Sequence, residues 1–198
     1  GEEEIIQRIE EQVKLRWLPT TRVDTGGWVK VEPLIIGNLD AEMLIVVHAD
    51  RLREGPHPVI WDRETNTLKG RLDNTSCLAV CLQLVKNPKF RETNWAVLVT
   101  TSEELGGCGH CHGGRGMIAY LNFLLTNYGQ EVLEQRKFIC LDVRSIDDGN
   151  VRLENRSIKL GDRLVLRLKD ESGLKADINL IERIRCSAKK ASIRLIDF

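Results

Sequence analysis

The sequence predicts an α/β fold, a three-layer α/β/α sandwich with a mostly parallel mixed central sheet. Three largely apolar runs, at 43–47, 95–100 and 137–141, are typical of strands buried on both faces, and the first of them is rich in β-branched residues. Helix-period segments alternate with these runs, as they do in layered α/β proteins. We therefore expect the three runs to be the central strands of the sheet.

Five segments carry apolar residues at helical spacing. The first follows an acidic turn, Glu2 to Glu4, which suits the positive end of the helix dipole, and Pro19 ends it. The second begins after a cluster of N-capping residues at 73–76. The expected helices span 2–18, 77–85, 117–126, 130–135 and 177–190.

Shorter strands are expected outside the three central runs. Residues 28–32 alternate between apolar and polar side chains after a Gly-Gly pair, which is typical of a strand with one buried face. Residues 151–153 and 164–168 alternate as antiparallel strands do. No repeat, low-complexity tract or linker interrupts the pattern, so we expect a single domain over 1–198. The further expected strands are 28–32, 34–36, 59–61, 151–153, 164–168 and 193–196.

Composition and charge narrow the classes of partner. The chain has 198 residues, enough for a sizeable core without disulfides. Lys and Arg number 29, as do Asp and Glu, and no basic stripe is present, so we expect no nucleic-acid partner. The longest apolar runs are too short for a bilayer, so we expect no membrane partner. The first residues lack the pattern of a signal peptide, and the leading Gly indicates a processed or engineered terminus. We therefore expect a cytoplasmic protein.

The cysteines are spread through apolar segments of a chain too large to need a disulfide scaffold. We interpret four of them as buried free thiols in a reducing compartment. These four are Cys77, Cys81, Cys140 and Cys186.

The other two cysteines belong to a C-x-x-C-H pattern, Cys108 to His112, which matches haem attachment. Haem is disfavoured because covalent attachment belongs outside the cytosol. A structural zinc here would crowd four ligands into five residues, which is poor geometry. The glycines of 106–116 are better explained by a tight turn over a site.

Ionisable residues follow the ends of the three central runs. Because the carboxyl ends of parallel strands form one edge of an open α/β sheet, we expect these side chains to converge there. Any one of these ionisable residues could simply lie on a solvated surface. That explanation fits the whole group poorly, because each of them follows a predicted buried strand. Crowded carboxylates repel one another, and a divalent cation neutralises them. One histidine with carboxylates suits Zn²⁺, Mn²⁺ or Co²⁺. The residues are His48, Asp50, Asp73, Glu103, Glu104 and Asp142.

Four short motifs carry a resemblance to a known family. They are Val-Val-His48-Ala-Asp50, Gly-Arg-Leu-Asp73-Asn, Thr-Thr-Ser-Glu103-Glu104-Leu-Gly-Gly and Cys-Leu-Asp142. In order and spacing, residues 25–198 resemble the co-catalytic zinc exopeptidase superfamily of aminopeptidases, carboxypeptidases and amide deacylases. The resemblance implies a metal-dependent hydrolase that cleaves a terminal peptide or amide bond with a water bridged by two zinc ions. Co²⁺ or Mn²⁺ are alternative metals. The substrate would be a peptide or an N-acyl amino acid, and a homo-oligomer is left open.

The resemblance also implies a role for each residue. Asp50 would orient the imidazole of His48, and Glu103 would be the general base. Asp73 would bridge both metals. The metal ligands would be His48, Asp73, Glu104 and Asp142.

One departure from the family concerns the second metal site. The superfamily has a late metal-binding histidine, and no histidine follows His112 here. We therefore expect residues 1–198 to form a metallopeptidase-like catalytic domain truncated at its C-terminal end, which binds at most one metal tightly. Alternatively, the site is completed differently, or the second metal site is lost. The alternative function is a non-catalytic protein with an incomplete metal site that acts by binding partners.

Overall fold

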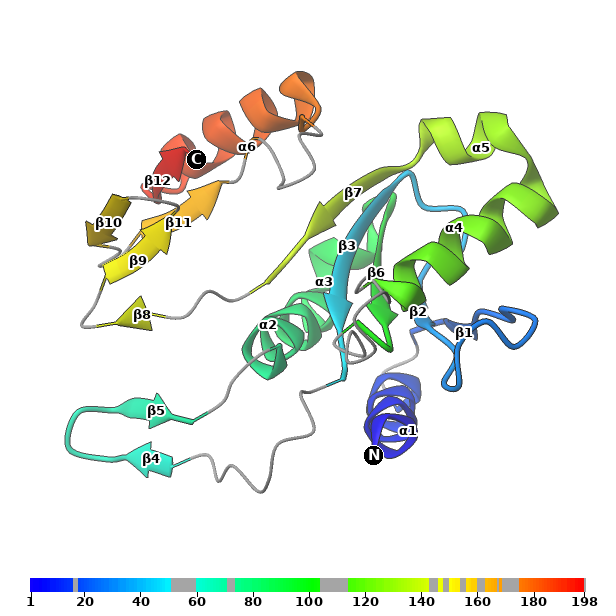
Figure 1. Ribbon diagram of the computed structural model, residues 1–198, viewed down its shortest axis with the longest axis horizontal. Helices are drawn as coiled ribbons and strands as arrows, with labels where there is room; N and C mark the ends of the chain where they lie inside the picture. The colour runs from blue at the N-terminus through cyan, green and yellow to red at the C-terminus, as the bar shows by residue number, and fades with distance from the viewer. Residues whose placement is uncertain are drawn as a thin grey trace. The chain divides into compact units, whose positions relative to one another are not determined.

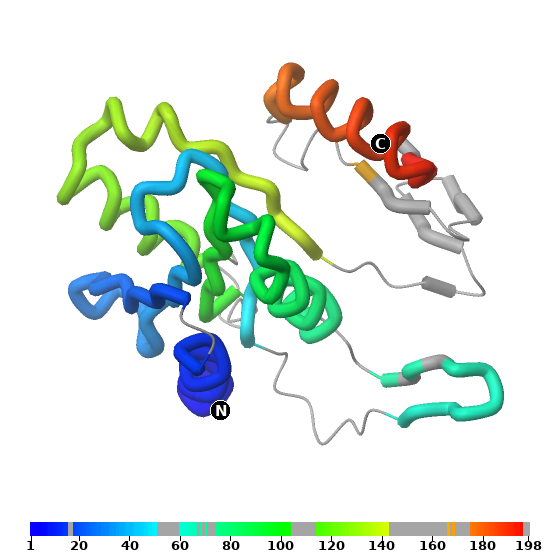
Figure 2. The backbone as a smooth tube through the Cα atoms, turned by 180° about the vertical axis from the view of Figure 1, so that it is seen from behind, coloured from blue at the N-terminus to red at the C-terminus, as the bar shows by residue number. Residues whose placement is uncertain are grey.

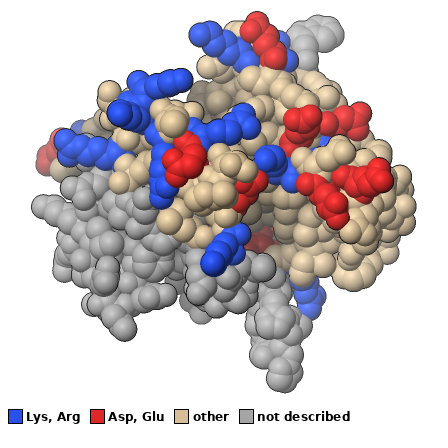
Figure 3. Space-filling model, turned by 90° about the horizontal axis from the view of Figure 1, so that it is seen from above, with Lys and Arg blue, Asp and Glu red and all other residues tan. Residues whose placement is uncertain are grey.

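The computed structural model describes residues 1–15, 18–50, 60–70, 74–103, 114–142, 146–147, 150–153, 156–159, 163–166, 168 and 175–197. They group into two compact units, Gly1–Val143 and Arg144–Phe198. On the described residues of the face drawn in Figure 3, acidic and basic side chains are interspersed. Among the described helices we find no candidate for a membrane-spanning segment.

A five-stranded mixed sheet forms the centre of the first unit, in the order β1-β2-β6-β3-β7 (Figure 1). Its parallel part consists of β6 (Trp95–Thr100), β3 (Met43–His48) and β7 (Lys137–Cys140). Strand β2 (Leu34–Gly37) runs antiparallel to β6, and β1 (Thr20–Arg22) antiparallel to β2. The parallel strands are the three apolar runs, which confirms the predicted α/β class.

Helices cover both faces of this sheet. Helices α1 (Glu2–Lys14), α2 (Thr75–Lys86) and α3 (Pro88–Arg91) supply residues to one apolar core. Helices α4 (Arg115–Tyr128) and α5 (Gln130–Gln135) supply residues to the other. Figures 1 and 2 view these helices from opposite sides. The arrangement is the predicted three-layer α/β/α sandwich.

Strand β3 illustrates why the central runs are continuously apolar. Ile45 and Val47 point into the core that contains α1 and α2, whereas Leu44 and Val46 point into the core under α4. All residues of β3 are buried, because both of its faces are covered.

The expected strand at 28–32 is wrong: these residues, all described, form bends. Val29 and Val31 are buried and Trp28 is exposed, so the alternation of burial is present. However, the free edge of β2 is taken by β1, and the segment has no ladder to join. The alternation of apolar and polar residues at 28–32 therefore predicted which side chains are buried, but it did not predict a paired strand.

Strand β7 was expected to be central, but it is an edge strand in the described part of the sheet, with β3 as its neighbour. Its first three residues are half-buried and Cys140 is exposed. The expectation of a buried thiol at Cys140 is therefore also wrong, because the strand is open on one side.

A hairpin follows β3 along the chain and ends before α2. It consists of β4 (Ile60–Asp62) and β5 (Thr67–Lys69), of which the sequence predicted only the first. Asn66 adopts the left-handed conformation that the turn needs, with φ of 51°. Ile60, Trp61 and Leu68 are exposed on the hairpin.

The second unit contains two small sheets. Strands β8 (Ile146–Asp147), β9 (Asn150–Leu153) and β10 (Arg156–Lys159) form an antiparallel meander. Strands β11 (Arg163–Leu166) and β12 (Arg194–Asp197) form a separate pair.

The pairing of β11 differs from the prediction. It was expected to be antiparallel, but β11 and β12 are parallel. The physical reason is the connection through α6 (Ile178–Lys190), because a helical crossover returns the chain in the same direction. Asp177 caps this helix by accepting hydrogen bonds from the backbone amides of Asn179 and Leu180.

Exposure on α6 corrects one more expectation. Cys186 is an exposed free thiol and not a buried one, since it lies on the outer side of an amphipathic helix. Cys81 on α2 is a buried free thiol as predicted, and Cys77 is half-buried.

Candidate functional site

The carboxyl ends of β6, β3 and β7 form one edge of the sheet, called here the site edge. His48 is the last residue of β3 and pairs with Thr100, the last residue of β6. The Thr100 hydroxyl donates to the Val47 carbonyl at 3.2 Å, and the Ala49 amide donates to the Thr100 carbonyl at 2.9 Å. These bonds fix the two strand ends against each other.

The imidazole of His48 lies between two carboxylates. Its Nδ1 is 3.4 Å from Oδ1 of Asp50, and its Nε2 is 3.8 Å from Oδ1 of Asp142. His48 and Asp50 are buried, with side chains 8% and 2% exposed, whereas that of Asp142 is 65% exposed. The Asp50 carboxylate faces Nδ1 of the ring without forming a hydrogen bond to it, and Nε2 faces the exposed carboxylate of Asp142.

Asn74 is a site residue that sequence reasoning missed. It is the N-cap residue of α2, but its side chain makes no capping bond and is almost fully buried. Its Nδ2 donates instead to the carbonyl of Leu141 at 2.7 Å. The Leu141 amide donates to the Val46 carbonyl at 2.9 Å. Both backbone groups of the residue before Asp142 are thus held.

The turn after β6 carries Glu103. Ser102 is buried and has a φ of 58°, a left-handed conformation that is costly for a residue with a Cβ. The Gly114 amide donates to the Glu103 carbonyl at 3.3 Å. A Cβ on Gly114 would lie 3.5 Å from Oε2 of Glu103, so the start of α4 runs close beside this carboxylate.

Gly116 allows α4 to begin directly against the end of β6. A Cβ at this position would overlap the carbonyl oxygen of Thr101 and lie 2.7 Å from its nitrogen. The glycine-rich sequence predicted a tight turn, but it did not indicate which glycine is in contact.

Cys140 lies in the electrostatic neighbourhood of two carboxylates from different segments. Partial loss of hydration at the sulfur raises the pKa of the Cys140 thiol although the residue as a whole is exposed, and the negative charges of Glu103 and Asp142 raise this pKa further. The same thiol interacts with both charges, so Glu103 and Asp142 both lie near the end of β7.

Two predicted site residues lie outside the described residues. These are Asp73 and Glu104, and the C-x-x-C-H segment, Cys108 to His112, also lies outside them. Within the described part of the chain, no group of three His, Cys, Asp or Glu side chains is arranged to hold a metal. The four-ligand cluster and the ligand roles therefore stay predictions.

The geometry of His48 and Asp142 fits a shared metal ion. Two ligand atoms of a tetrahedral zinc, each about 2.0–2.1 Å from the metal, lie roughly 3.4 Å apart. The observed separation of 3.8 Å between Nε2 and Oδ1 requires a small inward movement, and Asp142 is exposed enough to make it. Imidazole nitrogen and carboxylate oxygen are also donor atoms that zinc accepts.

Comparison with solved structures supports the fold. LapB of Legionella pneumophila aligns over 99% of this chain and 46% of its own, with 13% identity and a TM-score of 0.52. The LapA aminopeptidase of Legionella pneumophila aligns over 98% and 47%, with 13% identity and a TM-score of 0.52. A tripeptidase from Staphylococcus aureus aligns over 74% and 39%, with 14% identity and a TM-score of 0.49.

The chain spans about half the length of the two Legionella structures. No family model matches the chain, and comparison with curated proteins also finds no match. The likeness therefore concerns the fold.

Proposed function

We propose that the chain carries the metal site of a hydrolase of the co-catalytic zinc exopeptidase superfamily, acting on a terminal peptide or amide bond. The observation that carries this proposal is the imidazole of His48 between Asp50 and Asp142 at the site edge. A histidine whose second nitrogen is held by a carboxylate is the usual arrangement of a metal ligand. The likeness in fold to an aminopeptidase from Legionella pneumophila supports the same class.

In this proposal, His48 and Asp142 hold one metal ion, Glu104 holds a second, and Asp73 bridges the two. When bound, zinc would polarise the scissile carbonyl and lower the pKa of water. Asp50 would hold the proton on Nδ1 of His48 once the 3.4 Å gap closes to a hydrogen bond, which would leave the Nε2 lone pair for the metal. Asn74 holds the backbone beside Asp142.

Glu103 is proposed to move the proton. Its carboxylate would accept a proton from the attacking water and then protonate the nitrogen of the leaving amine. Its half-buried position beside the start of α4 supports this role, because the carboxylate is only partly covered there.

The substrate is proposed to be a peptide or an N-acyl amino acid. A single catalytic domain and a cytoplasmic location are parts of the same proposal, and the oligomeric state stays open. The choice between amino- and carboxypeptidase depends on groups that read the substrate terminus.

Zinc binding to the 198-residue chain tests the proposal directly. Calorimetric titration should detect zinc binding to the unmodified chain and to Glu103→Gln, but at least tenfold weaker binding to His48→Asn and Asp142→Asn. Asp40→Asn is a matched control, because Asp40 is an exposed aspartate on the loop before β3. Equal affinity in the control and in His48→Asn would refute the metal site.

Hydrolysis of short peptides by the intact enzyme then tests the role of Glu103 as general base. Glu103→Gln preserves size and removes the basic group, so hydrolysis should fall about 10²–10⁴-fold while zinc content is unchanged. The 198-residue chain, with at most one tightly bound metal, should show little or no hydrolysis. An intact protein that binds zinc without hydrolysing peptides would favour the non-catalytic alternative.

A further inference from the structure

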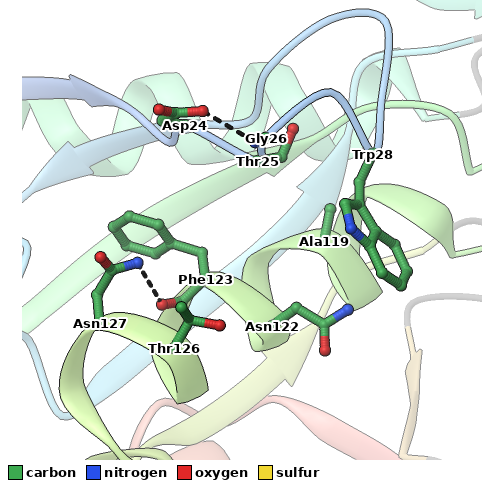
Figure 4. Close-up of a pocket in the computed structure, with 9 residues that line it drawn as sticks. All are labelled: Asp24, Thr25, Gly26, Trp28, Ala119, Asn122, Phe123, Thr126 and Asn127. Atoms are coloured by element: carbon green, nitrogen blue, oxygen red, sulfur yellow. Dashed lines mark hydrogen bonds between the residues drawn. The ribbon is translucent and has the colours of Figure 1, made fainter.

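A pocket of about 260 Å³ lies between the turn after β1 and one face of α4 (Figure 4). We call it the α4 pocket. The turn contributes Asp24, Thr25 and Trp28, and α4 contributes Asn122 and Phe123, among others. None of these residues has a part in the proposed hydrolysis.

A buried hydroxyl in the α4 pocket lacks a partner. Thr25 is 7% exposed, and its Oγ1 has no hydrogen-bond partner among the described residues. Buried polar atoms are normally satisfied by protein, water or ligand. The hydroxyl lies beneath the surface of the turn, so it is buried behind the pocket wall and does not itself face a ligand.

The charge of the pocket is negative. Its lining, all of it described, includes one carboxylate, Asp24, and no lysine, arginine or histidine. Oδ1 of Asp24 accepts from the Gly26 amide at 2.9 Å, which holds the carboxylate in place at the turn. A cationic ligand is thus favoured over an anionic one.

Aromatic rings and acceptors complete the lining. Trp28 is 63% exposed and stands on one side of the pocket, and Phe123 lies on the other side (Figure 4). Ring faces attract ammonium groups. Asn122 and Thr126 on α4 add oxygen acceptors between the two rings.

We propose that the α4 pocket binds a primary alkylammonium group, carried either by a free amine or by a lysine side chain of a peptide. The ammonium would be attracted by the carboxylate of Asp24 and would donate to the side-chain oxygen of Asn122, and the alkyl chain would lie against Trp28 and Phe123. The pocket is smaller than the roughly 300–1,000 Å³ of drug-sized sites, which suits a group the size of a side chain. This site is separate from the proposed function and does not depend on it.

The test is a titration of the 198-residue chain, followed by backbone amide chemical shifts. The probes are n-butylammonium and N-acetyl-lysine amide, with n-butanol and N-acetyl-norleucine amide as neutral comparators. We expect both cations to shift the amides of Thr25, Ala119 and Asn122 with millimolar dissociation constants, and the neutral probes to bind at least about fivefold more weakly. Tighter binding of the lysine derivative would identify a peptide as the source of the ammonium, and equal binding would identify the free amine as sufficient.

Variants separate charge from shape. Asp24→Asn keeps the acceptor for Gly26 and removes the charge, so it should weaken both cations about fivefold. Glu11→Gln, an exposed acid on α1, should not change them. Trp28→Ala should weaken binding and Trp28→Phe restore most of it. The proposal would be overturned if neutral and cationic probes bound with equal affinity, or if the amides of Thr25, Ala119 and Asn122 did not shift. Unchanged affinity in a folded Asp24→Asn variant would also overturn it. If Asp24→Asn does not fold, unchanged affinity in Trp28→Ala would do the same.

Discussion

Two residues without a reactive group, an asparagine and a glycine, hold the backbone around the candidate site. Asn74 spans from the start of α2 to the end of β7, and Gly116 lets α4 approach the end of β6. Neither residue has a reactive side chain. Both act by fixing where the neighbouring acids, Asp142 and Glu103, leave the sheet.

Asn74→Asp should destabilise the protein by about 1–3 kcal/mol, because it removes the donor to the Leu141 carbonyl and places a charge on a buried side chain. The matched control is Asn127→Asp, since Asn127 makes a similar bond to the Phe123 carbonyl at 2.9 Å but is exposed. The control should cost at most about 0.5 kcal/mol. Denaturant unfolding measures both, and equal losses would contradict the tethering role.

Gly116→Ala should be more harmful, by about 2–4 kcal/mol, because the new methyl group meets the backbone of Thr101 and cannot rotate away. Thr126→Ala, at an exposed position of the same helix, should change the unfolding free energy by at most about 0.5 kcal/mol. A stable Gly116→Ala variant would show that α4 can move away from β6 at little cost.

The sequence indicated His48, Asp50 and Asp142 because each follows an apolar run and joins a recognisable motif. Asn74 could not be identified in the same way. An asparagine at the start of a helix is normally interpreted as an N-cap residue. The hydrogen bond of Asn74 to Leu141 could not be predicted, because its partner is 67 residues away in the sequence. Gly116 was likewise one glycine among several until the contact with Thr101 was known.

At the scale of elements, the positions of helices and central strands followed from the sequence pattern, whereas strand pairing, and the burial that depends on it at Cys140, did not. The five predicted helices and the three apolar runs are present. Residues 28–32 alternate in burial but lack a neighbour, and β11 pairs in parallel because a helix intervenes. Pairing is decided by which edge another segment occupies, and periodicity does not contain that information.

Helix α2 provides a test of burial at this scale. Burial, and to a lesser extent Cys77, raise the pKa of Cys81 to about 12. At pH 8 only about one thiol in 10⁴ would be ionised, so iodoacetamide should modify exposed Cys186 and spare Cys81 in the folded protein. Peptide mass spectrometry should find Cys81 labelled only in denaturant or as the pH approaches 12. Rapid labelling of Cys81 at pH 8 would show that α2 opens readily.

At the scale of the whole molecule, the sheet separates two apolar cores and brings the candidate ligands together. His48 and Asp142 come from β3 and from the end of β7, segments that meet only in the folded chain. A metal held by both should therefore bind the folded state and not the unfolded one.

Zinc at 100 times its dissociation constant should stabilise the folded chain by about 2.7 kcal/mol, and EDTA should reverse this. The melting temperature measured with and without zinc reports the effect. His48→Asn should abolish the zinc-dependent rise in melting temperature, and Asp40→Asn should keep it. An equal zinc-dependent rise in the melting temperature of His48→Asn would show that zinc binds elsewhere, for example at the cysteines.

The pairing of β3 with β6 also has a consequence for synthesis on the ribosome. Val47 and Thr100, which hydrogen-bond at the site edge, are 53 residues apart in the sequence. At typical translation rates, about 3–10 s pass between the synthesis of β3 and the synthesis of β6. During that interval its apolar residues have no strand to pair with, and the nascent chain is a natural substrate for chaperones. We expect metal capture at His48 to follow translation of β6, because the imidazole has no fixed position before then.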